Sequence, residues 1–450
     1  MRRRRAGKTM AKKHLLILLP GGQAHMLRLP GVAMSFREAP LTGTLLAALV
    51  PPDLDLEITY CDGSVSPLPL AGKFDMVAIS AITGMALRAY ELADYFRSAG
   101  ATVVLGGIHV SLMPDEAAPH ADAIVVGYAE QTWPQLLRDW MAGELKPRYE
   151  HRGCAEIAGL PRPLRELQKP FGYAMPRTVN ATRGCRQVCD FCVAPAVPMG
   201  WATRPAGEVV ADIRSLRGRS FVFHDLNLAD DADYAKELFT AMIPLKKHWG
   251  ALVSTKVARD GQLLDLMARS GCGYLLIGFE TVNSSALGAM RKKFNAEFSY
   301  ADVVGALHDR GIVVQGCFIF GLDDDAPDVF DATVAAVDDM KIDIPRFALY
   351  TPFPGTAAFK RLGAENRLLH KNWTYYDTQH TVIRPKNMSP EELDAGFIRA
   401  WRECYRLSRA MRRTGLRKNS HIAAVGNLAY TLYARKLAHD VNRFPKEDTL

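Results

Sequence analysis

The sequence predicts an α/β fold built from two successive runs of alternating strands and helices. Short apolar segments recur through residues 14–142 and again from residue 175, and helical patterns separate them in both stretches. Parallel strands joined by helices are buried on both faces, which explains why these segments are apolar throughout. A loop with three closely spaced cysteines follows the first strand of the second run. We therefore expect two βα domains, of which the second carries a metal centre.

Composition and charge limit the class of protein. The chain has 450 residues, 48% of them hydrophobic and 23% charged, which is typical of a globular protein of about three domains. No apolar run approaches the roughly 18 residues of a membrane span, and the N-terminus lacks a signal-peptide core, so we expect a cytoplasmic protein. Residues 1–13 hold seven basic groups and no acid, and residues 399–443 hold eleven against two acids. Since the net charge is +8, the body between these ends is acidic, and we expect no nucleic-acid partner.

After the basic extension 1–13, residues 14–142 predict a doubly wound sheet of five parallel strands. The expected strands are 14–19, 56–60, 76–80, 102–105 and 123–126, with helices at 41–49, 85–98 and 130–141. Ligands of such sheets bind beyond the carboxyl ends of the strands. Glycine-rich loops follow several of these strands, and glycine allows a large ligand to approach the backbone closely.

A proline-containing linker, residues 143–174, separates the two runs. In the second domain, residues 175–355, the expected strands are 175–182, 220–224, 251–255, 274–279, 312–320 and 346–351. The expected helices are 207–216, 232–245, 261–270, 299–310 and 325–340. Six βα units with a metal loop after the first strand fit a partial barrel whose site lies at the carboxyl ends of the strands. Residues 356–450 predict a mostly helical, basic C-terminal region.

Cys185, Cys189 and Cys192 have the spacing C-x3-C-x2-C. Three thiolates on one loop can hold a [4Fe–4S] cluster and keep one iron open to a small molecule. The alternative is a structural zinc site, which needs a fourth ligand, often in a second cysteine or histidine pair. No such pair is present, because the remaining cysteines are isolated along the chain: Cys61, Cys154, Cys272, Cys317 and Cys404.

This spacing, with the aromatic Phe191 before the last cysteine, resembles the radical S-adenosylmethionine (SAM) superfamily. The resemblance implies a [4Fe–4S] cluster whose open iron chelates SAM, and a six-unit barrel. It also implies roles for residues at strand ends: Asp225 and Asn227 near the methionine end of SAM, and Glu280 near SAM. The fifth strand carries two glycines around an isoleucine, a family pattern that lets backbone approach the adenine: Gly316, Ile319 and Gly321. We interpret Cys317, within this stretch, as a small core residue.

Residues 14–142 resemble the cobalamin-binding domain that precedes many radical SAM domains. The resemblance implies that the loops after the strands hold the corrin and its tail, with cofactor-binding residues Ser80, Thr83, Gly106, Gly107 and Gly127. Many cobalamin proteins place a histidine on cobalt within D-x-H-x-x-G. The nearest match here, at residues 23–28, contains His25 but lacks both the Asp and the Gly. A histidine without an orienting partner is a poor ligand, so we expect cobalamin without protein histidine on cobalt.

These cofactors imply a cobalamin-dependent radical SAM enzyme. The leading hypothesis is a C-methyltransferase that uses a 5′-deoxyadenosyl radical and methylcobalamin at an unactivated carbon. The alternatives are an oxidative cyclase or rearrangement enzyme, and a non-catalytic cobalamin or Fe–S sensor. The resemblance also implies a flavodoxin- or ferredoxin-type electron donor. The substrate cannot be read from the sequence, although we expect a small, lipid-like or pigment-like molecule.

The C-terminal region allows two interpretations. Apolar or aromatic residues recur near helical spacing at 397, 398, 401, 404, 405, 407 and 411, with arginines mostly on the opposite side. Residues 422–437 predict a second apolar helix with basic residues near its end. Basic amphipathic helices contact anionic membranes peripherally, but most amphipathic helices cover a core. We favour packing on the barrel and keep membrane contact as the alternative.

Overall fold

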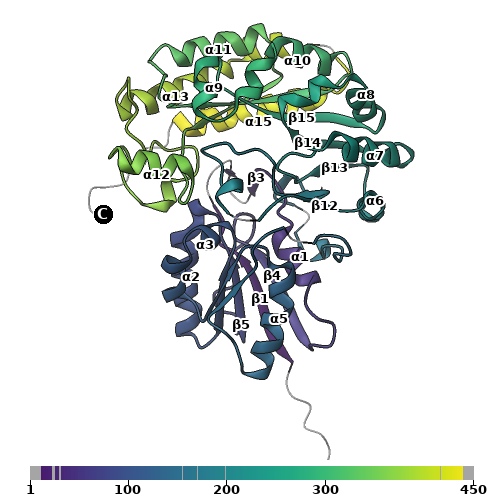
Figure 1. Cartoon of the computed structure of the whole chain (residues 1–450), viewed down its shortest axis with the longest axis vertical. Coiled ribbons are helices and arrows are strands. Elements are labelled where there is room, and N and C mark those ends of the chain that lie inside the picture. Colours follow the sequence, from purple (N-terminus) through teal and green to yellow (C-terminus); the bar gives the residue numbers. More distant parts are fainter. Residues whose placement is uncertain are drawn as a thin grey trace, which may run out of the picture.

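The computed structural model describes residues 12–22, 26–29, 32–154, 156–169, 171–197, 199–415 and 417–438. Two six-stranded sheets lie toward opposite ends of the long axis of the molecule, and the strand β3 (Val32–Glu38) lies between them (Figure 1). The N-terminal sheet is purple to blue in this view, and the second sheet with its helices is teal to green. The predicted α/β class is confirmed.

The N-terminal sheet contains all five predicted strands and one more. Its order is β4-β1-β5-β6-β7-β8, and every pairing is parallel. The strands are β1 (Lys13–Leu19), β4 (Leu56–Asp62), β5 (Met76–Ser80), β6 (Thr102–Gly106), β7 (Ala123–Val126) and β8 (Arg148–Glu150). The extra strand β8 lies in the segment expected to be a linker. Its three residues are too few for a hydrophobic period to reveal them.

Helices cover both faces of this sheet because its strands are apolar on both. Leu16 and Leu18 of β1 belong to the core on the side of α2, whereas Leu15 and Ile17 belong to the core on the side of α5. The helices are α1 (Thr42–Ala48), α2 (Ala86–Ser98), α3 (Ile108–Leu112), α4 (Pro114–Ala117) and α5 (Ala129–Ala142). The strand order reverses at β1 and β5, and a doubly wound sheet binds its ligand at such a switch point.

The second sheet is the predicted partial barrel. Its strands are β10 (Thr178–Val179), β13 (Ser220–Phe223), β14 (His248–Val253), β15 (Cys272–Glu280), β16 (Val313–Phe320) and β17 (Ile344–Leu349), paired in this order and all parallel. Its helices are α6 (Ala206–Ser215), α7 (Ala232–Met242), α8 (Gly261–Arg269), α9 (Ser284–Ala289), α10 (Tyr300–His308), α11 (Val329–Asp339) and α12 (Ala357–Ala364). Side-chain caps from Asp231 and Asp260 begin α7 and α8.

A small third sheet connects the two domains and was not expected. β2 (Met26–Leu29) pairs antiparallel with β3, and β3 pairs parallel with β9 (Tyr173–Met175), just before the barrel. Ser35 and Tyr173 are buried in this junction. The hairpin therefore carries residues of the N-terminal segment to the mouth of the barrel.

The C-terminal helices are α13 (Pro390–Cys404), α14 (Leu407–Thr414) and α15 (Ser420–Ala438). A capping box between Ser389 and Glu392 begins α13. Phe397, Trp401 and Cys404 of α13 are fully buried in the barrel core, as the favoured interpretation expected. Leu407 and Met411 of α14 are instead 75% and 68% exposed. No helix among the residues described is both long enough and apolar enough to cross a bilayer.

Candidate active site

The cysteine loop begins directly after β11 (Thr182–Arg183), which pairs antiparallel with β12 (Ala202–Thr203). Gly184 has φ +76°, and a Cβ at this position would lie 2.0 Å from the carbonyl oxygen of Gly200. Only glycine fits this turn, which brings Cys185 to the beginning of the loop. Cys189 is buried, and Cys185 and Cys192 are half-buried.

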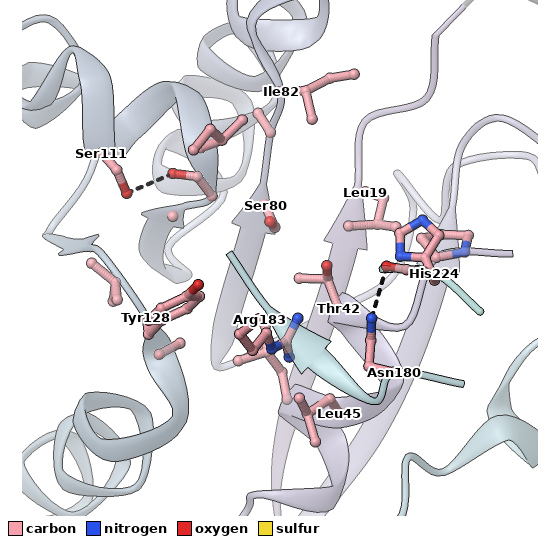
Figure 2. Close-up of a pocket in the computed structure, with 18 of the residues that line it drawn as sticks. Leu19, Thr42, Leu45, Ser80, Ile82, Ser111, Tyr128, Asn180, Arg183 and His224 are labelled. Carbon is pink, nitrogen blue, oxygen red and sulfur yellow. Dashed lines mark hydrogen bonds between the residues drawn. The ribbon is translucent and has the colours of Figure 1, made fainter. Parts of the chain in front are cut away.

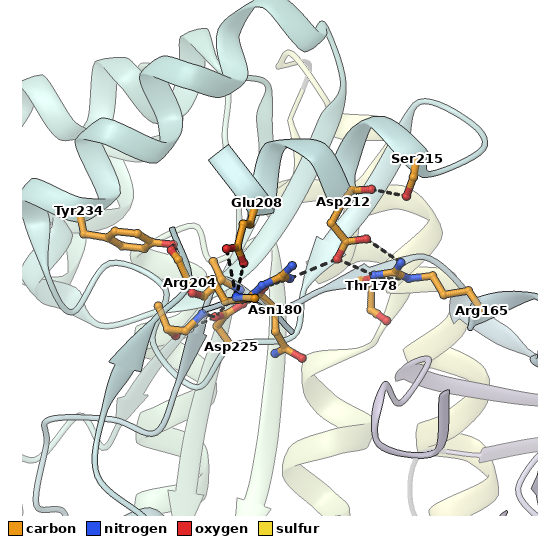
Figure 3. Close-up of polar contacts among 12 residues, drawn as sticks. Arg165, Thr178, Asn180, Arg204, Glu208, Asp212, Ser215, Asp225 and Tyr234 are labelled. Atoms are coloured by element: carbon orange, nitrogen blue, oxygen red, sulfur yellow. Dashed lines mark hydrogen bonds and ion pairs between the residues drawn. The ribbon is translucent and has the colours of Figure 1, made fainter. Parts of the chain in front are cut away.

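A polar network holds the chain that leads into this loop (Figure 3). The buried carboxylate of Asp212 accepts hydrogen bonds from Arg165 (2.8 Å) and Arg204 (3.2 Å). Arg165 also donates to the carbonyl of Thr178, and Arg204 donates to the carbonyl of Asn180, each at 3.0 Å. Because both arginines bind the carboxylate and the backbone, residues 178–182 are held firmly at the mouth of the barrel.

Asp225, expected near the methionine end of SAM, is bound to the base of the cysteine loop. Its carboxylate accepts hydrogen bonds from the backbone N–H of Ala181 (3.0 Å), from the hydroxyl of Thr182 (2.7 Å) and from the backbone N–H of Thr182. Burial raises the pKa of Asp225 to about 6, although these donors lower it. The geometry gives Asp225 a positioning role, and its direct contact with SAM stays a prediction.

Asp230 holds the loop itself, a role that the sequence did not reveal. Its carboxylate accepts from the backbone N–H of Arg186 (2.7 Å) and from the Gln187 amide (2.8 Å), and it lies 3.7 Å from the Cys185 sulfur. The neighbouring carboxylate, Asp231, caps α7 instead.

Asn227 offers an unused hydrogen-bond donor in the same region. Its Oδ1 accepts from the backbone N–H of Ser254 at 3.2 Å. Its Nδ2 is buried and has no partner among the residues described. A buried donor without a partner is costly, and a bound ligand can satisfy it. Asn227 therefore fits its predicted role as a SAM contact.

Glu280 lies at the end of β15 in a conformation that non-glycine residues rarely adopt, with φ +68°. The register of β15 against β16 shifts between Gly278 and Glu280, so the strand ends in an irregularity that redirects the carboxylate. There Glu280 forms a buried ion pair with Lys292, whose ammonium also donates to the Gly278 carbonyl at 2.9 Å. Strained backbone of this kind is concentrated at functional sites.

Lys292 was missed in the sequence, because nothing in its local pattern distinguishes it. It is 7% exposed. Burial raises the pKa of Cys189 to about 11, and the positive charge of Lys292 partly opposes this effect. Lys292 and Glu280 therefore lie close enough to Cys189 and Cys192 for their charges to act on these thiols.

The fifth strand requires a correction. Gly316 was paired with Ile319 and Gly321 in the pattern of two glycines around an isoleucine. In β16, however, a Cβ at Gly316 would lie 2.9 Å from Ile342 and 3.1 Å from Phe279, in the core under the helices. Because strand residues alternate between faces, Cys317 shares the inner face with Ile319.

The expectation that Cys317 is a core residue is therefore wrong. It is half-buried, and the charged groups that influence its pKa include Arg346, Glu280 and Glu38. Gly321 has φ +94°, and its N–H donates to Asp325 at 2.9 Å; its place near the adenine stays a prediction.

The three thiols fit a [4Fe–4S] cluster. Burial raises the pKa of Cys185 to about 12 and also raises that of Cys192, so bare thiolates would be costly here. Iron bound directly to sulfur supplies the compensating positive charge. Among the described residues no three His, Cys, Asp or Glu side chains gather closely enough to hold a single ion. Phe191, beside the last cysteine, packs edge-on against Tyr350 with ring centroids 6.5 Å apart.

A cavity of 520 Å³ lies between the carboxyl edge of the N-terminal sheet and the mouth of the barrel (Figure 2). Ser80, Gly106, Gly107 and Gly127 line it, in agreement with their predicted place near cobalamin. Thr83 does not, because its hydroxyl points to the buried ring of His109, 3.3 Å away. From the barrel, Asn180, Arg183, His224, Asp225 and Leu226 line the same cavity.

Two of the loop glycines are required by geometry. Gly107 has φ +97°, and a Cβ there would lie 2.7 Å from backbone atoms of Ala81. Gly127 has φ +82°, and its Cβ would lie 2.2 Å from the His151 carbonyl oxygen. By contrast, a Cβ at Gly106 would make only ordinary van der Waals contacts, the nearest being 3.6 Å to Val125. These two turns thus require glycine, and they bring backbone to the edge of the cavity, which fits a large ligand such as a corrin.

Three histidines are relevant to the question of whether the protein coordinates cobalt. His25 lies outside the described residues. His109 is fully buried between Thr83 and Glu116. His224 lines the cavity from the barrel side, and burial lowers its pKa. Cobalt ligation therefore stays a prediction.

One ion pair joins the two halves across the cavity. Arg183, next to the cysteine loop, contacts Glu130 of α5 at 2.9 Å. Elsewhere at the junction Trp373 donates to Glu116 at 2.8 Å, and Tyr173 donates to Asp62 at 2.7 Å. The two halves are therefore fastened to each other on several sides of the cavity.

Comparison with known proteins agrees with this geometry. Residues 22–137 match the family model described as the B12 binding domain, and residues 179–335 match that of the radical SAM superfamily. The chain is 32% identical to a bacteriochlorophyllide d C-12(1)-methyltransferase of Chlorobaculum tepidum, over 91% of each chain. The chain belongs to the cobalamin-binding radical SAM family. It is therefore an enzyme whose cofactors are a [4Fe–4S] cluster, SAM and cobalamin.

Two further matches describe the breadth of this family. An anaerobic magnesium-protoporphyrin IX monomethyl ester cyclase of Cereibacter sphaeroides is 25% identical, over 74% of this chain and 60% of that protein. The solved structure of the radical SAM methyltransferase TsrM from Kitasatospora setae, with cobalamin and a [4Fe–4S] cluster bound, has a TM-score of 0.62 at 17% identity. That alignment covers 79% of this chain and 78% of TsrM, and it supports the fold of both domains together.

Proposed function

We propose that this radical SAM enzyme transfers a methyl group to an unactivated carbon of a pigment-like or lipid-like small molecule. The observation that carries the proposal is the 520 Å³ cavity lined by both domains. Loops that fit cobalamin form one wall, and the loop after β13, which is bonded to the base of the cysteine loop, forms the other. A substrate in this cavity would lie between a methyl donor and a radical source. Reacting groups held in such a position gain greatly in rate.

When bound, the cluster with SAM supplies a 5′-deoxyadenosyl radical, and cobalamin supplies the methyl group. The chain itself orients these parts. Asp225 and Asp230 fix the cysteine loop, and the buried pair of Glu280 and Lys292 places fixed charge beside it. The apolar side chains of Leu19, Leu45 and Ile82 line the cavity and exclude water from it.

Anaerobic reconstituted enzyme, incubated with SAM labelled as CD3 and with bacteriochlorophyllide d as probe, tests the proposal. We expect a product in which one CD3 replaces one hydrogen. One SAM should leave as S-adenosylhomocysteine, and a second should yield methionine and 5′-deoxyadenosine that carries the substrate hydrogen. SAM cleavage with no label in any product would contradict methyl transfer.

An oxidative cyclase is the second candidate, favoured by the similarity to the magnesium-protoporphyrin ester cyclase. The same experiment separates the two reactions. A cyclase forms 5′-deoxyadenosine and an unlabelled product that has lost hydrogen, without S-adenosylhomocysteine.

We also propose that an acidic flavodoxin- or ferredoxin-type protein donates electrons at the cysteine loop. Val188, inside this loop, is 58% exposed. Three cations lie on or near this loop. Arg186 pairs with Asp231 at 3.0 Å, Lys256 contacts Gln187 at 3.1 Å, and the charge of Arg291 acts on the pKa of Asp190. Complementary charge accelerates association of electron carriers. Arg291→Glu should slow SAM cleavage with reduced flavodoxin and leave the rate with dithionite unchanged; equal rates with flavodoxin would contradict the proposal.

The exposed apolar residues of the C-terminal helices suggest peripheral contact with an anionic membrane. Val425 and Leu428 of α15 are 69% and 65% exposed, like Leu407 and Met411 of α14. Arg409 and Arg413 are not available for lipid, because both pair with Asp338. Arg402 of α13 and Arg412 of α14 are exposed. Arg406, between these helices, is exposed but pairs with Glu403 at 2.6 Å. Basic residues beside apolar side chains favour such a surface.

Sedimentation with anionic liposomes at low salt tests this contact. The full chain should pellet, and the double variant Met411→Glu with Leu428→Glu should not. Leu70→Glu is a matched control, because Leu70 is also exposed, at 39%, but lies in the N-terminal domain. Equal pelleting of all three proteins, or none, would contradict membrane contact.

A further inference from the structure

Two guanidinium groups meet where β3 enters the mouth of the barrel. Arg37 belongs to β3 of the hairpin, and Arg346 belongs to β17 of the barrel. The two lie close enough for their charges to interact, although only Arg37 lines the cavity. Burial lowers the pKa of Arg37, and the nearby charge of Arg346 lowers it further. Like charges close together in a buried place are unfavourable unless something negative lies between or beside them.

Arg37 has no partner for its guanidinium within the described part of the chain. Its backbone N–H donates to Ser35 at 3.2 Å, but no hydrogen bond or ion pair of its side chain is present. Arg37 is among the residues that line the cavity, as is the neighbouring Glu38. The other arginine of the cavity, Arg183, is paired with Glu130 at 2.9 Å. Arg37 is thus an unpaired cation that faces the space available to ligands.

The carboxylates near Arg37 do not form an ion pair with it. Glu38 and Asp377 both act on its pKa, but neither lies within ion-pair distance. Asp377 accepts hydrogen bonds from the backbone N–H of Gln379 (2.8 Å) and from the His380 ring (2.9 Å). Glu38 is shared, because it also raises the pKa of Arg346. A carboxylate of a bound ligand would accept hydrogen bonds from the guanidinium of Arg37.

The position of Arg37 favours the substrate over cobalamin as the source of this carboxylate. The loops that fit the corrin lie at the carboxyl edge of the N-terminal sheet, at Gly107 and Gly127. Arg37 instead neighbours Arg346 of the barrel and Tyr433 of α15. These neighbours belong to the half of the molecule that holds the radical source.

We propose that Arg37, supported by Arg346, binds a carboxylate of the substrate, which is therefore an apolar molecule with an acidic group at one end. The proposal rests on the pigment-like or lipid-like substrate of the proposed function, and it adds that this substrate carries a negative charge. A guanidinium binds a carboxylate through two parallel N–H···O bonds, which fixes orientation as well as affinity. The anchor would thus select which carbon of the substrate faces the methyl donor.

Binding of a matched pair of chlorins tests the anchor without turnover. Pheophorbide a has one free propionate, and in its methyl ester this charge is removed. We expect anaerobic holoenzyme without reductant to bind the acid about tenfold to a hundredfold more tightly than the ester, as followed by chlorin fluorescence. In Arg37→Gln the two affinities should become equal, with that of the ester unchanged, and Arg37→Lys should retain part of the preference.

Arg88→Gln serves as the control, because Arg88 is a surface residue of α2 that pairs with Glu91 at 2.7 Å. It should keep the full preference for the acid. Cobalamin and iron content, measured on every variant, establish that each is folded. Equal binding of acid and ester by wild type, a preference that survives in Arg37→Gln, or loss of cobalamin in that variant would overturn the anchor and leave the proposed function intact. Failure of the holoenzyme to bind either chlorin would overturn the pigment substrate, and the anchor with it.

Discussion

The two halves of the molecule on either side of the cavity are built by different means. In the barrel, the functional groups are side chains: the three thiols, the carboxylates of Asp225 and Asp230, and the pair of Glu280 with Lys292, and of these Asp225 lines the cavity itself. At the edge of the N-terminal sheet, backbone conformation is decisive, because Gly107 and Gly127 adopt turns that no other residue fits. A cluster needs ligand atoms and charge, whereas a corrin needs space and amide groups. The difference predicts how each wall responds to substitution.

The largest effect is expected at the thiols. Cys189→Ser should abolish both the cluster and SAM cleavage, since only three clustered cysteines are present in the sequence and each binds a separate iron. Iron content and 5′-deoxyadenosine formation measure the outcome. Cys154→Ser is the control: Cys154 is exposed, does not belong to the cysteine loop and donates to the Trp201 carbonyl at 2.8 Å, so activity should persist. Turnover by a Cys189→Ser protein that keeps about four irons per chain would contradict the assignment.

The buried ion pair should give the next largest effect. Lys292→Met leaves Glu280 buried and unpaired, which should lower the apparent free energy of unfolding by about 3–5 kcal/mol. Adding Glu280→Gln should restore part of this loss, because the uncompensated charge is removed. Anaerobic chemical denaturation of the holoprotein measures both changes.

Lys12→Met provides a matched comparison for this prediction. Lys12 pairs with Asp55 at 2.9 Å, but both side chains are at least half exposed. Exposed pairs contribute at most about 1 kcal/mol, so this variant should be close to wild type. If Lys12→Met and Lys292→Met lowered the free energy of unfolding equally, the buried pair would contribute no more to stability than an exposed pair.

On the opposite wall, adjacent glycines should behave differently. Gly107→Ala forces a Cβ to within 2.7 Å of the Ala81 backbone at φ +97°, so cobalamin affinity should fall at least about tenfold. Gly106→Ala meets nothing closer than 3.6 Å and should bind cobalamin nearly as wild type does. Absorbance titration with hydroxocobalamin compares them, and similar affinities would show that this wall tolerates side chains.

The sequence by itself determined those features that depend on local pattern. Apolar periodicity located the βα units, because a strand buried on both faces must be apolar along its length. The C-x3-C-x2-C spacing identified the cluster loop, since all three ligands lie within eight residues of one another. Gly107, Gly127 and Gly321 were named through the family resemblance, as glycines that let backbone approach a cofactor; their positive φ values appear in the structure.

Only the tertiary structure decided which side chains face one another. Gly316 was misassigned because a shift of one residue in a strand exchanges its two faces, and Cys317 was taken for core for the same reason. Thr83 follows a cofactor-facing strand, yet its hydroxyl faces His109, away from the cavity. Lys292 and Arg37 carry no local signature. Their roles arise from contacts between segments far apart in the chain, because burial and neighbouring charge, not sequence spacing, determine what a cation can bind.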